Sequence, residues 1–195
     1  MTRCPSVAIM LCHRQAVEAC ARALPLVLMC LFALGLLMTA SGCDKETSGT
    51  FTAKLGDEWF TLETAITPEE QALGLGGRTE IPENGGMIFI GTKDERKNFW
   101  MKDCLIDMDI IYVDQAGYID SIHTMKAVPL RQPNESQLDY ERRLRETASY
   151  DSIGRVRYVI EIRPRKATEL GLKRGDKLDL DLDRLKELAL LADGQ

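Results

Sequence analysis

Short runs in which apolar and polar residues alternate predict that much of this chain forms β-strands. The first two runs, Thr50–Leu55 and Glu58–Thr64, are separated only by Gly56 and Asp57, which is the spacing of a tight hairpin. Apolar and β-branched runs indicate further strands at Met87–Ile90, Asn98–Met101, Met108–Val113, Tyr118–Thr124, Arg157–Ile162 and Lys177–Leu180. A charged turn is predicted at Thr92–Lys97, between the first two of these.

Helix start and stop signals interrupt these strands. Thr67 and Glu70 form a capping box with Pro68 at the first helical position, and the glycines that follow end the predicted helix after about two turns. A second short helix begins at Pro164. The expected fold class is therefore α+β, with a mostly antiparallel, curled or barrel-like sheet and two to three short helices.

The predicted single small domain covers residues 50–182 and is followed by a C-terminal helix at residues 183–195. A charged helical insertion interrupts it at about residues 131–147, where Asn134 can cap the helix and opposite charges four residues apart can pair on the surface. We interpret this segment as an exposed insertion in preference to a partner-binding helix.

The N-terminal segment differs in kind from the rest of the chain. Arginines precede the apolar run Leu24–Met38, and small residues then lead to Cys43, as in a secretory signal. The Ala-Ser-Gly-Cys string at 40–43 resembles the bacterial lipobox, so residues 1–42 are predicted to be a lipoprotein signal peptide, Cys43 the lipidation site and residues 43–49 a tether. This predicts a cell-envelope protein that is anchored to a membrane and faces the periplasm or the exterior. An uncleaved single-span anchor is the alternative.

Cysteine content and charge exclude two classes of protein. Four of the six cysteines precede Cys43, and lipidation of Cys43 leaves Cys104 alone, which excludes an intrachain disulfide framework. Without residues 1–42 the chain has 22 basic and 29 acidic residues, a net charge of −7. Nucleic acid requires clustered positive charge, so it is not an expected partner.

The densest group of candidate functional side chains lies in Asn98–Asp114. Phe99 and Trp100 can stack on a planar or sugar-like ligand, and Lys102 can hold an anion. The simpler interpretation is that the aromatic residues pack in the core, and the segment taken alone favours it.

Acidic residues and a lone cysteine are the other candidates. Asp107 and Asp109 have the i, i+2 spacing that places both on one strand face, as carboxylate catalysis requires. His123 is the only histidine after the signal, so a multi-histidine zinc site is excluded. A Cys104–His123 dyad has suitable residue types, but a lone cysteine more often packs in a core. The sequence predicts neither a metal nor a cofactor.

Several strings, in order along the chain, resemble those of one protein family. They are Thr67–Glu70, Gly74–Arg78, Gly86–Phe89, Phe99–Lys102, Met108–Asp114, Tyr150–Ser152, Tyr158–Glu161 and Gly171–Asp176. This pattern resembles the family called domain of unknown function 192 (DUF192) over about residues 55–180. The resemblance implies a small α+β domain with a curled sheet, often secreted or membrane-tethered, with no established activity.

The same resemblance supplies the candidate binding residues. It implies a shared cleft lined by polar and aromatic members of the pattern, namely Arg78, Trp100, Lys102, Asp109 and Glu161. The chain departs from the family at Asp107, where proline is usual, and at Asp103–Cys104, where a polar pair is usual. It also lacks the cysteine that many members carry before Tyr150, so a cysteine-dependent role does not transfer.

From these residues we expect a non-enzymatic binding module for a small polar or carbohydrate-like ligand, because an aromatic face beside a cation and a carboxylate suits such groups. The first alternative is a hydrolase that uses two of Asp107, Asp109 and Glu161 at a separation of about 5–10 Å. The second is a protein-interaction module that docks a membrane partner through the charged insertion.

Overall fold

The computed structural model describes residues 49–193. The predicted signal peptide at 1–42, the lipidation site Cys43 and nearly all of the predicted tether lie outside the described residues. Among the helices that are described, none is both long enough and apolar enough to cross a bilayer.

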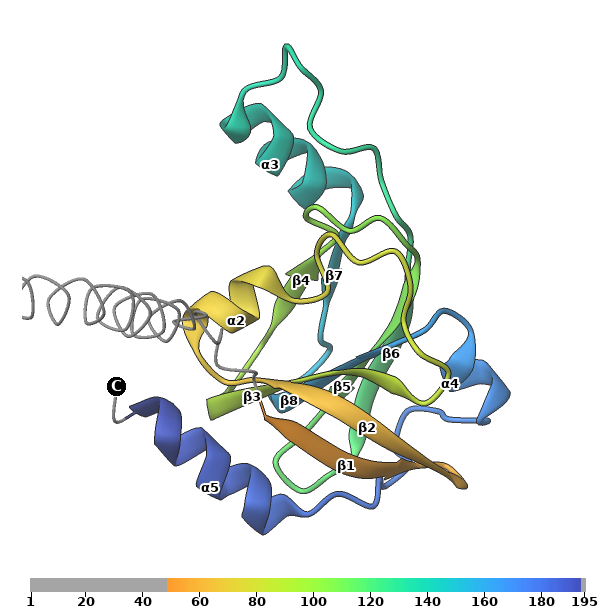
Figure 1. The fold of residues 1–195 in the computed structure, drawn as a ribbon. Helices are drawn as coiled ribbons and strands as arrows, with labels where there is room; N and C mark the ends of the chain where they lie inside the picture. The colour runs from red at the N-terminus through yellow and green to blue at the C-terminus, as the bar shows by residue number, and fades with distance from the viewer. Residues whose placement is uncertain (1–48, 194–195) are drawn as a thin grey trace, which may run out of the picture. The chain divides into compact units, whose positions relative to one another are not determined.

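A six-stranded sheet forms the centre of the domain (Figure 1). Its strands are, in spatial order, β1 (Thr50–Leu55), β2 (Glu58–Ala65), β3 (Gly85–Glu95), β8 (Val156–Ile162), β5 (Met108–Val113) and β6 (Ile119–Met125). Neighbouring strands are antiparallel except for β2 and β3, which are parallel and are connected through a helix. A second, two-stranded sheet pairs β4 (Asn98–Trp100) with β7 (Ser149–Asp151). The described helices are α2 (Pro68–Leu73), α3 (Gln137–Thr147), α4 (Lys166–Glu169) and α5 (Leu182–Asp193).

Two local predictions are confirmed. Leu55 pairs with Glu58 across the β1–β2 turn, as the hairpin spacing predicted. The capping box of α2 is complete, because the Glu70 amide donates to the Thr67 hydroxyl at 3.2 Å and the Thr67 amide donates to the Glu70 carboxylate at 3.0 Å. Both features depend on residues that are close in sequence, which is why they could be predicted.

Strand β3 is longer than predicted. The predicted strand ended at Ile90 and gave way to a charged turn, but β3 continues to Glu95. Its register against β8 shifts between Ile90 and Glu95, and the Arg157 Nε lies 3.0 Å from an Asp94 carboxylate oxygen. Pairing with a neighbouring strand thus keeps extended a charged segment that by its sequence alone resembles a turn.

The predicted strand at Lys177–Leu180 is wrong. Its residues make two isolated bridges instead, between Lys54 and Asp179 and between Tyr118 and Lys177. The segment therefore touches β1 at one edge of the sheet and the residue before β6 at the other. The sheet has two end strands, β1 and β6, and is not closed into a barrel. The domain is therefore of the α+β class with an open, mostly antiparallel sheet. The four described helices correspond to the predicted helices after Thr67 and after Pro164, the charged insertion helix and the C-terminal helix.

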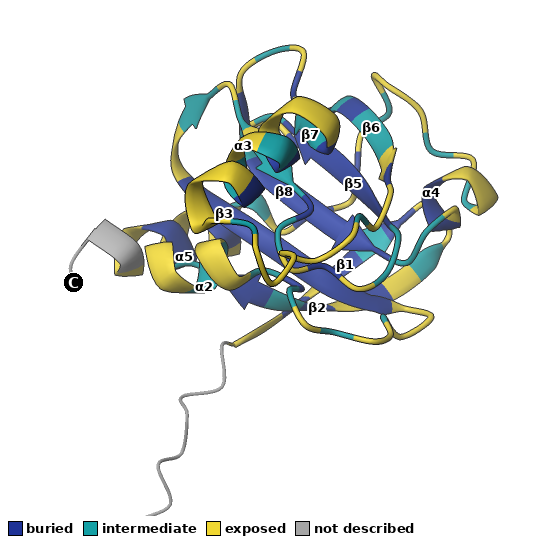
Figure 2. Ribbon diagram, turned by 90° about the horizontal axis from the view of Figure 1, so that it is seen from above, coloured by how far each residue is buried: buried dark blue, intermediate teal, exposed yellow. Residues whose placement is uncertain are grey.

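Each face of the sheet is covered by different elements (Figure 2). One face packs against α5, through Leu185 and Leu188, and against α4. The opposite face packs against the β4 region and against α3, through Tyr140 and Leu144. Because side chains alternate between faces along a strand, the register of the central strands decides which polar residues reach this second face.

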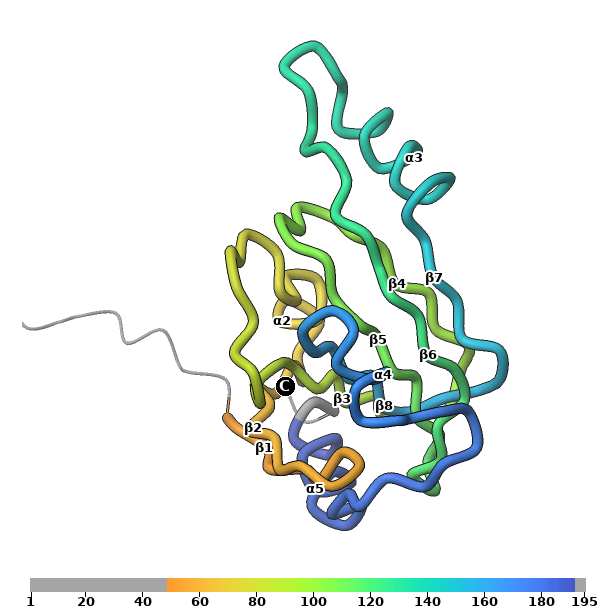
Figure 3. Tube along the Cα trace, turned by 90° about the vertical axis from the view of Figure 1, so that its right-hand side faces the viewer, coloured from red at the N-terminus to blue at the C-terminus, as the bar shows by residue number. Residues whose placement is uncertain are grey.

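The charged insertion forms α3, which lies beyond the ends of β4 and β7 (Figure 3). Ser136, and not the predicted Asn134, caps the helix by accepting from the Asp139 amide. Tyr140 and Leu144 are fully buried. The insertion is therefore packed on the domain along one side, and it is more than an exposed appendage.

Candidate functional site

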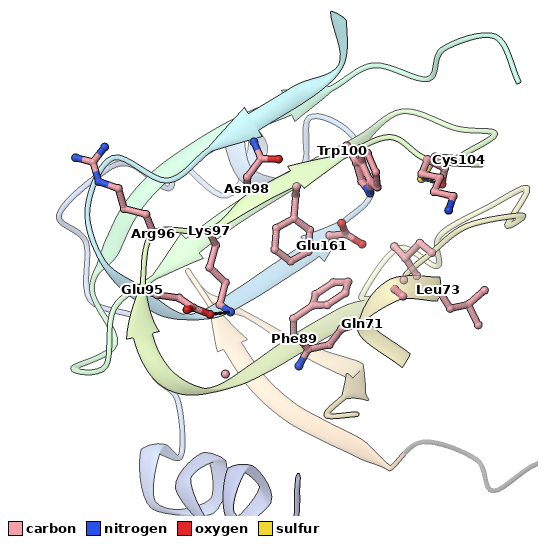
Figure 4. A pocket seen from close by; sticks show the side chains of 16 residues that line it. Gln71, Leu73, Phe89, Glu95, Arg96, Lys97, Asn98, Trp100, Cys104 and Glu161 are labelled. Carbon is pink, nitrogen blue, oxygen red and sulfur yellow. Dashed lines mark hydrogen bonds and ion pairs between the residues drawn. The ribbon is translucent and has the colours of Figure 1, made fainter. Parts of the chain in front are cut away.

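A pocket of about 500 Å³ lies on the sheet face that α3 and the β4 region cover (Figure 4). Its walls come from α2 with the glycine turn after it, from β3, from β8 and from β4 with the residues that follow. This volume falls in the range of roughly 300–1,000 Å³ that small-molecule sites occupy. The side chains that line it include Gln71, Phe89, Lys97, Phe99, Trp100, Lys102, Cys104 and Glu161.

Three aromatic rings line this pocket. Phe89 on β3 and Phe99 on β4 meet edge to face, with ring centroids 4.8 Å apart and planes at 84°. Trp100 is the next residue of β4 and also lines the pocket. Aromatic rings in the wall of a pocket suit an apolar or cationic ligand group.

Glu161 provides the buried carboxyl group of the pocket. It lies on the central strand β8, opposite Met87 of β3 and Ile110 of β5, and therefore points to the pocket face of the sheet. Only 5% of the residue is exposed, and no hydrogen bond from another described residue reaches its side chain. Burial disfavours the charged form and raises the pKa of Glu161 to about 8, so the carboxyl group is mostly protonated at neutral pH.

Cys104 also lines the pocket but is held as a neutral thiol. Burial, with a further contribution from nearby Glu161, raises its pKa to about 12. Its Sγ donates to the Lys102 carbonyl at 3.4 Å. The candidate dyad with His123 is not formed, because the His123 Nε2 lies 3.1 Å from the Asp151 carbonyl and its ring packs beside Tyr112.

Charged side chains surround the pocket mouth, and most of them are already paired. The Lys97 ammonium contacts the Glu95 carboxylate at 2.9 Å, and this bond lowers the pKa of Glu95. The Lys102 ammonium lies 3.4 Å from the carboxylate of Glu141 on α3. Arg96 lines the mouth as an exposed side chain. The mouth therefore carries an excess of positive charge outside the buried carboxyl group.

Helix α3 contacts the pocket wall through Trp100. The Arg145 guanidinium stacks 4.9 Å from the centroid of the Trp100 ring. On the loop after β4, the Asp103 amide donates to the Tyr140 hydroxyl at 3.0 Å. The insertion thus supports the same segment that carries Trp100 and Lys102.

Of the five residues predicted for the cleft, the structure brings Trp100, Lys102 and Glu161 together and places the other two elsewhere. Arg78 makes a two-pronged ion pair with Glu63, with both bonds at 2.6 Å, and does not line the pocket. Asp109 points to the opposite face of the sheet, where its buried carboxylate accepts from the Thr124 hydroxyl and from the Ala167 amide.

The positions of Asp109 and Asp107 have physical causes. Asp109 pairs with Ile162, whereas its neighbour Ile110 pairs with Glu161, so strand alternation sends the two carboxylates to opposite faces. Asp107 is held at the surface by the Lys126 ammonium at 2.7 Å. The three carboxylates considered for hydrolysis therefore do not share one cavity. Within residues 49–193, no three metal-binding side chains come together either.

Sequence reasoning missed the contribution of α2 and β3 to the site. Phe89 belongs to an apolar run that any buried strand would show, and no local signal marks it as a pocket residue. Gln71 donates from its amide nitrogen to the carbonyl of Ala65 at 3.3 Å and to that of Ile90 at 3.1 Å, which fixes α2 beside the strands. The contact with Ile90 joins segments that are 19 residues apart in sequence.

The fold and the pocket define a small mixed α+β domain whose mostly antiparallel sheet carries, on one face, a cavity lined by aromatic and polar side chains. This chain belongs to the DUF192 family, described as an uncharacterized ACR, whose sequence profile matches residues 51–180. The resemblance seen in the sequence strings is thereby confirmed for the domain.

Several solved structures, including the following two, are similar to this chain. One is a "putative transcription regulator" from Sinorhizobium meliloti, 25% identical, with a TM-score of 0.53, covering 68% of this chain and 93% of that one. The other is a protein of unknown function from Novosphingobium aromaticivorans, 30% identical, with a TM-score of 0.51, covering 67% of this chain and 83% of that one. A comparison with curated proteins finds no match.

Proposed function

We propose that this protein is a lipid-anchored envelope protein whose domain binds a small polar or carbohydrate-like molecule without transforming it. The observation that carries the proposal is the pocket of about 500 Å³, which combines three aromatic rings with the buried carboxyl group of Glu161. The lining mixes these rings and other apolar side chains with at least as many polar ones, and polar groups of this kind orient a ligand that is itself polar.

Binding is favoured over hydrolysis by the state of the candidate catalytic groups. Hydrolysis by two carboxylates needs both at one cavity, and of Asp107, Asp109 and Glu161 only Glu161 lines the pocket. The thiol of Cys104 is a poor nucleophile because its pKa is raised to about 12. These groups can donate and accept hydrogen bonds to a ligand, which is what a binding site requires.

The binding proposal predicts a ligand-dependent signal from Trp100. The chain has two tryptophans, and Trp59 is 60% exposed on β2, outside the pocket. In a Trp59→Phe variant the fluorescence therefore reports on Trp100 alone. Screening sugars, amino sugars and other small polar compounds by thermal shift should give compounds that both raise the Tm and change this fluorescence.

The control for that screen is a matched pair of tryptophan substitutions. Trp100→Ala should weaken binding of each hit by at least about fivefold, because stacking on an aromatic ring contributes about 1–3 kcal/mol. Trp59→Ala should leave the affinity unchanged. If no compound stabilises the domain, and Trp100→Ala alters only folding, the binding function is wrong.

The proposed location makes a separate prediction. The lipobox-like string that ends at Cys43 predicts a mature protein whose first residue is an acylated Cys43. Mass spectrometry of the protein purified from bacterial membranes should find diacyl or triacyl Cys43, and Cys43→Ser should abolish the modification. An N-terminal peptide that still contains residues 1–42 would show a single-span anchor in place of the lipid.

A further inference from the structure

Glu161 is a buried acid that has no counter-charge within the described chain. It is 5% exposed, it lines the pocket, and no ion pair within 4 Å reaches it from residues 49–193. One of its oxygens would lie 3.9 Å from a Cβ built on Gly74, at the turn after α2 that lines the same pocket. A buried acid of this kind is costly as an anion, so a ligand that brings a positive charge gains strongly from meeting it.

The rings beside Glu161 strengthen this preference. Phe89 and Phe99 line the pocket with it, and Figure 4 shows Glu161 between Phe89 and Trp100. Aromatic faces attract cations, most strongly where water is excluded. Trp100 already attracts two cations of the chain, because Lys102 lies 6.0 Å and Arg145 4.9 Å from its ring. Neither phenylalanine has such a partner in the described part of the chain.

Two of the chain's own cations near the pocket are already paired. Lys97 is paired with Glu95 and Lys102 with Glu141, at 2.9 and 3.4 Å. Arg96, which has no such partner in the described chain, leaves the mouth with an excess of positive charge, and this disfavours a ligand with several positive charges. The arrangement therefore suits a molecule that carries a single positive charge and inserts that charge deeply, leaving its polar remainder at the mouth.

We propose that the pocket takes a small monocationic molecule, an amine or a quaternary ammonium compound, whose charged nitrogen pairs with Glu161 and packs against Phe89 and Phe99. This inference rests on the proposed binding function and names the chemical class of its ligand. An amino sugar and a choline-like alcohol both satisfy it, because each has one cationic nitrogen and a hydroxyl-bearing remainder.

Binding of such a cation is coupled to loss of a proton. Several other titratable groups lie around Glu161: Cys104, Asp103 and Lys102 on the segment between β4 and β5, Tyr112 on β5, and Glu95 to Lys97 where β3 turns into β4. The polar residue that α2 contributes to the pocket is Gln71, which is neutral. With a pKa of about 8, Glu161 is mostly protonated at pH 7, and a bound cation favours its ionised form. Affinity for a permanent cation should therefore rise with pH, by up to about tenfold per pH unit below that pKa.

The test compares matched probes on the full-length protein in non-ionic detergent. Choline is paired with its uncharged isostere, in which a tert-butyl group replaces the trimethylammonium group, and glucosamine is paired with glucose. By calorimetry, the charged member of each pair should bind at least tenfold more tightly than the neutral one. Choline binding should release close to one proton at pH 7, measured in two buffers with different ionisation enthalpies.

Two variants assign the effect to Glu161. Glu161→Gln should remove the preference for the charged probes and the proton release, whereas Glu187→Gln, at an exposed position on α5, should retain both. Equal binding of charged and neutral probes would overturn the monocation proposal and leave the binding function standing. A charge preference that survives Glu161→Gln would also overturn it. If neither charged probe binds, the proposal is wrong, and the compound screen decides the binding function independently.

Discussion

Replacing Glu161 with glutamine should make the domain's stability nearly independent of pH between 5 and 8, where the wild-type protein loses stability as the pH rises. The pKa of Glu161 is raised to about 8 in the folded domain, while a glutamate in an unfolded chain has a pKa of about 4.3. Between these values the folded state holds a proton that the unfolded state has released. The free energy of unfolding therefore falls with increasing pH, and the full penalty is reached above pH 8.

The expected size of this effect is large for one side chain. A difference of one pKa unit corresponds to about 1.4 kcal/mol, so the wild-type domain should lose on the order of 3–5 kcal/mol from pH 4 to pH 8. Urea unfolding of both proteins at several pH values, followed by tryptophan fluorescence, measures the difference. The buried amide of the glutamine changes the free energy of unfolding by the same amount at every pH, so the pH dependence of this variant stays flat.

The control for this titration is Glu187→Gln, which removes a carboxylate that is 67% exposed by its side chain. Its stability curve should run parallel to that of the wild type. Parallel curves for Glu161→Gln as well would mean that Glu161 is ionised in the folded domain at neutral pH. That result would contradict the burial of an unpartnered carboxyl group described above.

Substitution of Gly86 by alanine should destabilise the domain by about 4 kcal/mol or more, or prevent folding. Gly86 lies on β3 with a φ of +150°, a value that other residues rarely adopt. A Cβ at this position would lie 2.1 Å from the backbone oxygen of Glu161 and 3.1 Å from a methyl group of Ile162. Two central strands would have to separate, because neither obstacle is a flexible side-chain end.

Gly77→Ala separates the steric effect from the backbone effect. Gly77 also has a positive φ, of +76°, but nothing lies within 4 Å of a Cβ built there. Gly77→Ala should lower the free energy of unfolding by only about 1–2 kcal/mol, from backbone strain alone. Chemical denaturation of the two variants gives the comparison, and a similar loss for both would show that β3 and β8 can adjust around an added methyl group. Because Gly86 lies against the backbone of Glu161, the Gly86→Ala substitution, unlike Gly77→Ala, should also disturb the pocket.

Several parts of the site were accessible from the sequence for a local reason. The Phe-Trp-Met-Lys string identified Trp100 and Lys102, which are neighbours on one short segment and necessarily stay close together. Glu161 was identified by its place in the family pattern, and not by any chemical signal in its own strand. Its burial and its lack of a partner follow from the packing of α2, β3 and β4 around β8.

The remaining parts of the site depend on the register between paired strands, which cannot be predicted from a single sequence by local patterns. Asp109 and Glu161 are both acidic residues in buried strands, yet a pairing of Ile110 with Glu161 places them on opposite faces. A shift of one residue would have reversed this outcome, because side chains alternate with a period of two. Arg78 does not line the predicted cleft, because its guanidinium pairs with Glu63 on β2.

The sequence by itself determined the elements whose causes are local: the β1–β2 hairpin, the capped α2 helix, the α+β class and membership in the DUF192 family. It also predicts, through Cys43, a lipid anchor that mass spectrometry can test. Only the tertiary structure decided which side chains meet in the pocket, and it left one buried acid among aromatic rings. The reason is physical: capping and turns involve neighbours in the chain, whereas the pocket assembles four elements whose contacts exist only after the sheet has formed.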